Sequence, residues 1–125
     1  MNKKDLKFIL SAFVGWRLFL FVIVYFAIKM VPLQANFLGG GRGNYLGSPY
    51  FWSWINFDGE HYLAIAQEGY KNLTYFFFPV YPKLISLLGG VFGKDITTLG
   101  ILGLIVSNLS LLMALIGLWK LIRLD

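Results

Sequence analysis

Asp58, Glu60 and His61 are the residues of this chain whose types and spacing could do acid-base chemistry. His61 is the only histidine, and the chain has no cysteine, which excludes a thiolate nucleophile, a disulfide and a Cys-ligated zinc site. A carboxylate beside an imidazole can take a proton from a hydroxyl group or orient that group for attack. The three residues fall in residues 56–85, between two strongly apolar segments.

A short helix over about residues 59–68 is expected to position them, because Asp58 suits the N-cap and Gly69 suits the C-terminal stop. On a helix Glu60 points almost opposite to Asp58, whereas an extended segment would turn both carboxylates to one side, where they could hold a metal ion. We expect the helix, so these two carboxylates alone do not form a metal site. The sequence supports no cofactor, and a divalent metal ion held by other groups stays open. A capping Asp58 would still have one oxygen free for chemistry, so both roles stay open. Four residues of this helix share one face: Asp58, His61, Tyr62 and Ile65.

The composition is that of a membrane protein. Of the 125 residues 58% are hydrophobic and the mean hydropathy is +0.67, whereas soluble proteins are about half apolar. Two segments, about residues 8–30 and 98–119, are long enough to cross a hydrocarbon core of roughly 30 Å. A third run, about residues 82–92, is too short to cross and is expected to lie in the interface. The net charge of +5 comes from basic residues spread along the chain, which is not a nucleic-acid footprint.

Basic residues gather outside the two long segments, at Lys3, Lys4, Lys7, Lys120 and Arg123. The positive-inside rule then predicts that both ends are cytoplasmic, which requires an even number of crossings. Residues from about 31 to 96 should form one loop on the outer or lumenal side. Prolines and the glycines within residues 39–43 predict irregular backbone over residues 32–57. The sequence therefore predicts an all-α membrane protein in which two transmembrane helices flank an outer loop with two short interfacial helices.

Arg17 lies about nine residues into the first apolar segment, near the bilayer centre by the 1.5 Å rise of a helix. A charge at that depth needs a partner or a wet cavity. Asn108, at similar depth in the second segment, could pair with Arg17 but could not neutralise it. We expect the partner to be a further helix, another subunit or a lipid phosphate.

Two stretches carry a resemblance to a known family. Residues 57–70 read FDGEHYLAIAQEGY, and residues 76–85 read FFFPVYPKLI. They resemble the PIG-V type mannosyltransferases, the GPI mannosyltransferase II family and its prokaryotic relatives, whose pattern is close to W-D-x-x-H-F-x-x-I-A-x-x-G-Y followed by A-F-F-P-L-Y-P-x-L-I. Phe57, Phe76 and Val80 stand where the pattern has Trp, Ala and Leu. Residues 106–109 resemble the start of the family's next span.

The resemblance implies a GT-C glycosyltransferase, a polytopic enzyme that transfers a sugar, typically mannose, from a polyprenyl-phosphate donor to an acceptor hydroxyl. The reaction would occur at the outer face of a bacterial or archaeal plasma membrane, or at the lumenal face of the endoplasmic reticulum in a eukaryote. It implies that Asp58 deprotonates or orients the acceptor hydroxyl with His61 beside it. We predict that Glu60, Tyr62, Tyr81 and Arg17 bind substrate.

Family members are much longer, with many spans. We therefore expect this chain to be the N-terminal part of such an enzyme, inactive without its missing C-terminal helices. The alternative is a small non-enzymatic membrane module whose aromatic interfacial loop binds lipid or a partner helix.

Overall fold

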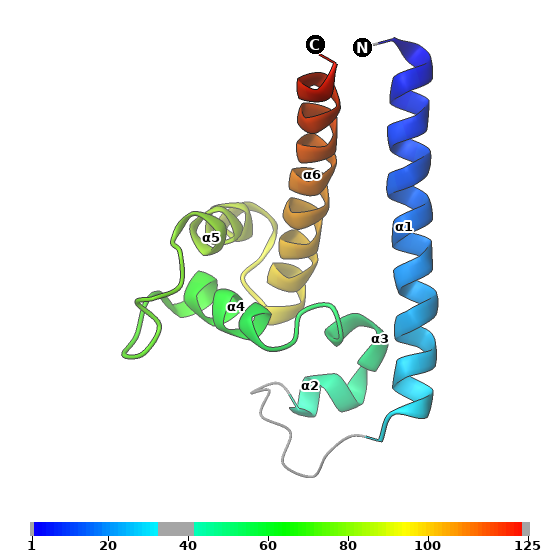
Figure 1. Cartoon of the computed structure of the whole chain (residues 1–125). Coiled ribbons are helices and arrows are strands. Elements are labelled where there is room, and N and C mark those ends of the chain that lie inside the picture. Colours follow the sequence, from blue (N-terminus) through cyan, green and yellow to red (C-terminus); the bar gives the residue numbers. More distant parts are fainter. Residues whose placement is uncertain (1, 33–41, 124–125) are drawn as a thin grey trace. The chain divides into compact units, whose positions relative to one another are not determined.

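The computed structural model describes residues 2–32 and 42–123, and its described residues form helices and no strands. The all-α prediction is confirmed, with two long apolar helices and shorter helices between them in the sequence (Figure 1). The helices in chain order are α1 (Lys3–Met30), α2 (Arg42–Gly47), α3 (Pro49–Trp52), α4 (Asp58–Glu68), α5 (Val80–Phe92) and α6 (Ile96–Ile122).

Helix α1 begins five residues before the predicted start, because a capping box precedes the apolar run. The backbone N–H of Asp5 donates to Asn2 Oδ1 at 2.8 Å, and the N–H of Asn2 donates to Asp5 Oδ2 at 3.2 Å. Two N-terminal donors that a helix cannot satisfy internally are thereby paired. The helix ends at Met30, shortly before Pro32. Its 28 residues span about 42 Å at 1.5 Å per residue.

Helix α6 begins two residues before the predicted start. The backbone N–H of Thr98 donates to Asp95 Oδ1 at 3.0 Å, which satisfies one of the free donors of the first turn. Hydrogen bonding from Thr98, first through its side chain and then through its backbone, lowers the pKa of Asp95 below the usual value. The helix continues for 27 residues and ends beside the basic residues Lys120 and Arg123.

Helices α1 and α6 are each long and apolar enough to cross a membrane. Only 6% of the most apolar window of α1 and 22% of that of α6 are buried. The core helix of a soluble protein would instead be mostly buried. Large apolar side chains stand exposed along both helices, for example Leu18 at 60% and Met113 at 72%. Water would make such surfaces unfavourable, whereas lipid would not.

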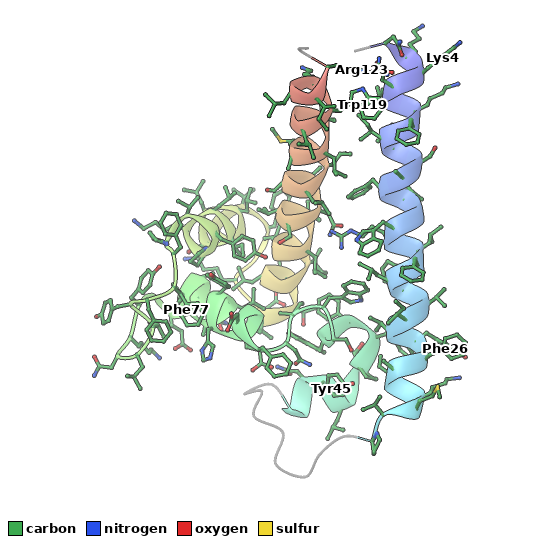
Figure 2. All side chains as sticks on the ribbon, in the orientation of Figure 1. Lys4, Phe26, Tyr45, Phe77, Trp119 and Arg123 are labelled. Atoms are coloured by element: carbon green, nitrogen blue, oxygen red, sulfur yellow. The ribbon has the colours of Figure 1, made fainter. Side chains whose placement is uncertain are left out.

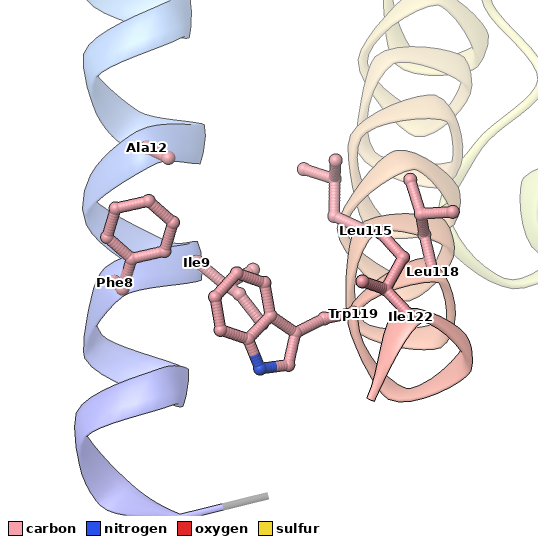
Figure 3. Close-up of a pocket in the computed structure, with 7 residues that line it drawn as sticks. All are labelled: Phe8, Ile9, Ala12, Leu115, Leu118, Trp119 and Ile122. Carbon is pink, nitrogen blue, oxygen red and sulfur yellow. The ribbon is translucent and has the colours of Figure 1, made fainter. Parts of the chain in front are cut away.

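The chain divides into two compact units. One unit comprises residues 1–32 and 107–125, and so contains α1 and the C-terminal part of α6. In it the rings of Phe8 and Trp119 lie 5.4 Å apart, and Arg123 Nη1 lies 3.4 Å from Asp5 Oδ1. A groove of about 130 Å³ opens between the two helices (Figure 3). We call it the α1–α6 groove, and its lining is Phe8, Ile9, Ala12, Leu115, Leu118, Trp119 and Ile122.

The other unit comprises residues 33–106 and has its own apolar core. The buried core residues come from the α3 region, α4, α5 and the start of α6: Trp52, Ile55, Leu63, Ala66, Ile85, Leu99 and Leu102. Helix α6 approaches closely at two glycines. A Cβ atom on Gly100 would lie 2.8 Å from Ile55 Cδ1, and one on Gly103 would lie 2.9 Å from the Tyr81 hydroxyl oxygen. Only glycine allows this separation without displacing a neighbour.

The prediction of irregular backbone over residues 32–57 was wrong for α2 and α3. Pro49 occupies the first turn of α3, where a missing N–H costs nothing. Trp52 at its end is 8% exposed and belongs to the core, and Phe51 packs against that core. Packing of these rings against the core stabilises the helical turns, although the prolines and glycines of this segment predict irregular backbone. The predicted loop glycines 39–41 lie outside the described residues.

Candidate functional site

The two stretches that carry the family resemblance pack against each other within one unit. The ring of Tyr62 on α4 meets the ring of Phe77 edge-on at 5.1 Å and that of Tyr81 on α5 at 5.2 Å. The Tyr70 hydroxyl donates to the backbone carbonyl of Phe77 at 2.8 Å. Phe77 lies beside α4 (Figure 2). Side chains separated by up to 20 positions in the sequence therefore form one aromatic cluster, consisting of His61, Tyr62, Phe77 and Tyr81.

Helix α4 starts at a strained turn. Phe57 adopts φ 58° and ψ −119°, and the N–H of Gly59 donates to the carbonyl of Asn56 at 3.2 Å. These are the angles of the first central position of a type II′ turn, which glycine normally occupies. Phe57 is the N-cap residue, and no side-chain capping bond is made. The prediction that Asp58 is the N-cap was therefore wrong, because the turn at Phe57 places Asp58 as the first residue of the helix itself.

Asp58 and His61 present their polar groups outward. Both residues are exposed, while Ile65, predicted on the same face, is only 5% exposed. The predicted face of α4 is therefore exposed at Asp58 and His61 and buried at Ile65. Within the described part of the chain, no hydrogen bond joins Asp58 to His61. A carboxylate free of a capping bond and a nearby imidazole could both reach a ligand from outside.

The ring of His61 is supported from one side. It lies 5.1 Å from the Phe77 ring at an interplanar angle of 32°. Phe77 thus limits the orientations of the imidazole and also contacts Tyr62. The sequence reasoning did not single out Phe77 as a site residue. Its position in the FFFP run that carries half of the resemblance was the available signal.

Tyr62 and Tyr81 are half-buried, and Glu60 is partly exposed. The Tyr81 hydroxyl donates to the backbone carbonyl of Gly103 at 3.0 Å, which ties α5 to α6. Tyr81 therefore has a structural contact besides any role toward a ligand. Substrate binding by Glu60, Tyr62 and Tyr81 stays a prediction.

Helix α4 ends as predicted. Gly69 adopts φ 84°, and its N–H donates to the carbonyl of Ile65 at 2.9 Å. Gln67, near this end, is exposed and donates from Nε2 to the carbonyl of Lys94 at 3.0 Å. This bond joins the end of α4 to the turn between α5 and α6.

Arg17 belongs to the other unit, so the structure does not join it with Asp58. Its guanidinium carbon lies 5.6 Å from the centre of the Phe13 ring, a cation–π contact. Its Nε is buried, with no hydrogen-bond acceptor among the described residues. A role of Arg17 in substrate binding stays a prediction.

Among residues 2–32 and 42–123, no three His, Cys, Asp or Glu side chains group together in a way that could hold a metal ion. On α4 the side chains of Asp58 and Glu60 are about 200° apart around the helix axis. The carboxylates on this helix therefore diverge rather than converge on one point.

Comparison of the chain with protein-family models, with curated proteins and with solved structures finds no match.

Proposed function

We propose that residues 57–85 contribute to the active centre of a membrane-embedded sugar transferase of the GT-C type, similar to the PIG-V mannosyltransferases. The sugar, typically mannose, would come from a polyprenyl-phosphate donor and pass to an acceptor hydroxyl. Support comes from the order and spacing of the two resembling stretches. Their packing through Tyr62, Phe77 and Tyr81 adds to it, since separate stretches of one site need to be held together.

One observation carries the proposal most directly: Asp58 is exposed, and within residues 2–32 and 42–123 its carboxylate has no hydrogen-bond partner. In the proposed reaction Asp58 orients the acceptor hydroxyl or takes its proton, while the acceptor oxygen bonds to the anomeric carbon. The bond from that carbon to the phosphate oxygen breaks, and the polyprenyl phosphate leaves. His61, held against Phe77, orients the acceptor or donates to the leaving phosphate.

The test is sugar transfer in the native membrane by the protein carrying Asp58→Asn. Loss of general-base action should lower the rate by about 10²–10⁴-fold. Glu68→Gln is the matched control, because Glu68 is an exposed carboxylate at the opposite end of α4 that pairs with Lys71. Activity retained by Asp58→Asn, with unchanged helicity, would contradict the proposal.

The alternative, a non-enzymatic module that binds lipid, is favoured by one observation. The segment between α4 and α5 exposes three aromatic rings, Tyr75 at 72%, Phe76 at 75% and Phe78 at 71%. Exposed aromatic side chains are typical of segments that insert into a membrane interface. Replacing all three by Ser should lower lipid contact of this segment in either case. Only the enzyme proposal also predicts loss of transfer in Asp58→Asn.

The proposed topology has both ends cytoplasmic and residues 57–85 outside. Because the chain has no cysteine, single-cysteine variants can be labelled cleanly with an impermeant maleimide in intact cells. Leu73→Cys, at a position 82% exposed, should be labelled, whereas Lys4→Cys should react only after the membrane is opened. The opposite pattern would invert the topology.

A further inference from the structure

The α1–α6 groove has no assigned ligand, and it lies at the basic end of both long helices. Its lining is apolar apart from the indole N–H of Trp119. Lys4, near the start of α1, and Arg123, directly after α6, lie at this end together with Trp119 (Figure 2). We propose that the groove binds one acyl chain of an anionic phospholipid, whose phosphate is held by Lys4 and Arg123. This proposal does not depend on the transferase activity.

The size of the groove fits a short section of a hydrocarbon chain. Its volume of about 130 Å³ is close to the roughly 150 Å³ of an apolar cavity that takes up a benzene ring. A second helix would need an axis separation of about 8–10 Å and a long contact face. A groove lined by seven residues is short for such a contact. The Trp119 ring reaches from α6 toward Phe8 and closes one side of the groove (Figure 3).

The position of Trp119 sets the depth of the groove. Indole rings prefer the boundary between headgroups and hydrocarbon. Ala12 and Leu115 then lie roughly 10 Å or less further into the hydrocarbon, at 1.5 Å of rise per residue. An acyl chain that lies along these residues brings its own headgroup to the level of Lys4 and Arg123.

The charge at this end favours an anionic headgroup. Basic residues in the first two turns of α1 and at the end of α6 are exposed: Lys3, Lys4, Lys7, Lys120 and Arg123. The acidic side chain described among them is Asp5, which contacts Arg123 Nη1. A guanidinium has five N–H donors, so Arg123 retains donors for phosphate while it contacts Asp5. Its position 4.8 Å over the Trp119 ring holds it at the mouth of the groove.

The test uses the full chain in phosphatidylcholine vesicles and measures tryptophan quenching by brominated lipid. Brominated phosphatidylglycerol should associate at least about five-fold more strongly than brominated phosphatidylcholine, the ratio expected for one basic residue near a headgroup. Trp119→Phe should remove most of this selective quenching.

Two variants separate charge from shape. Lys4→Gln with Arg123→Gln should lower the selectivity while leaving the groove intact. Ala12→Phe should fill the groove and reduce quenching by both brominated lipids while leaving the charges intact. Their matched controls, Lys29→Gln and Ala27→Phe at the other end of α1, should leave the selectivity unchanged, and circular dichroism checks helicity.

Three results would overturn the proposal. Equal quenching by the two brominated lipids would show that no anionic lipid is selected. Equal loss of selectivity in Lys29→Gln and in the double variant would show a general charge effect without a site. Disulfide cross-linking of Ala12→Cys between two chains would show that a second copy occupies the groove.

Discussion

Relief of the strained turn at Phe57 is a sensitive test of how α4 begins. The φ of 58° and ψ of −119° cost a residue that carries a Cβ atom about 1–3 kcal/mol. Phe57→Gly removes this strain but increases the backbone freedom lost on folding, which costs roughly 0.5–1 kcal/mol. The expected net effect is a stabilisation of up to about 2.5 kcal/mol, the difference between these two contributions.

Phe57→Ala is the matched control, because alanine keeps the Cβ atom and the strain but lacks the ring. The Phe57 ring is 68% exposed, so its removal should change stability by no more than about 0.5 kcal/mol. The measurement is equilibrium unfolding of the chain in detergent, followed by helical circular dichroism. If Phe57→Gly proves no more stable than Phe57→Ala, the folded protein lacks the strained turn, and α4 starts differently.

Two further predictions concern α6. Gly103→Ala should destabilise the fold by about 1–3 kcal/mol, the usual cost of overpacking, because its Cβ would meet the Tyr81 hydroxyl at 2.9 Å. Gly117→Ala should instead stabilise the fold, because its Cβ would have nothing within 4 Å and alanine gains up to about 1 kcal/mol of helix propensity. Thermal unfolding of the two variants measures both changes. Hydrogen bonds with Thr98 hold the pKa of Asp95 below its ordinary value of 3.8 in the folded chain. These bonds therefore contribute stability that is present above pH 3.8 and is lost as the pH falls through the lower folded-state pKa. Asp95→Asn should reduce the loss of unfolding free energy that the chain shows as the pH falls below 3.8. An unchanged loss would contradict the capping role of Asp95.

The long helices and α4 were predictable because each has a local signature. The apolar runs exceed the length needed to cross a bilayer, and Gly69 marks the end of α4. The early start of α1 was also encoded locally, in the Asn2 and Asp5 capping box. It was missed because the apolar run, rather than the cap, was used to place the boundary.

The remaining features depend on contacts between distant residues. Helix α3 forms where Trp52 can enter a core shared with Leu99, 47 positions later. The Tyr81 bond to Gly103 spans 22 positions. No periodicity along one segment specifies either contact. The positive φ at Phe57 likewise has no local signal, since glycine stands two residues later, at Gly59.

The hydrogen bonds of the tyrosines restrict what a ligand could find at this site. Both Tyr70 and Tyr81 use their single hydroxyl proton on a backbone carbonyl. Tyr81 could donate to a phosphate only after releasing the carbonyl of Gly103. If residues 57–85 act on a phosphate-linked sugar, His61 and cationic groups are therefore better donors to the phosphate than Tyr70 or Tyr81, whose hydroxyl protons are already used.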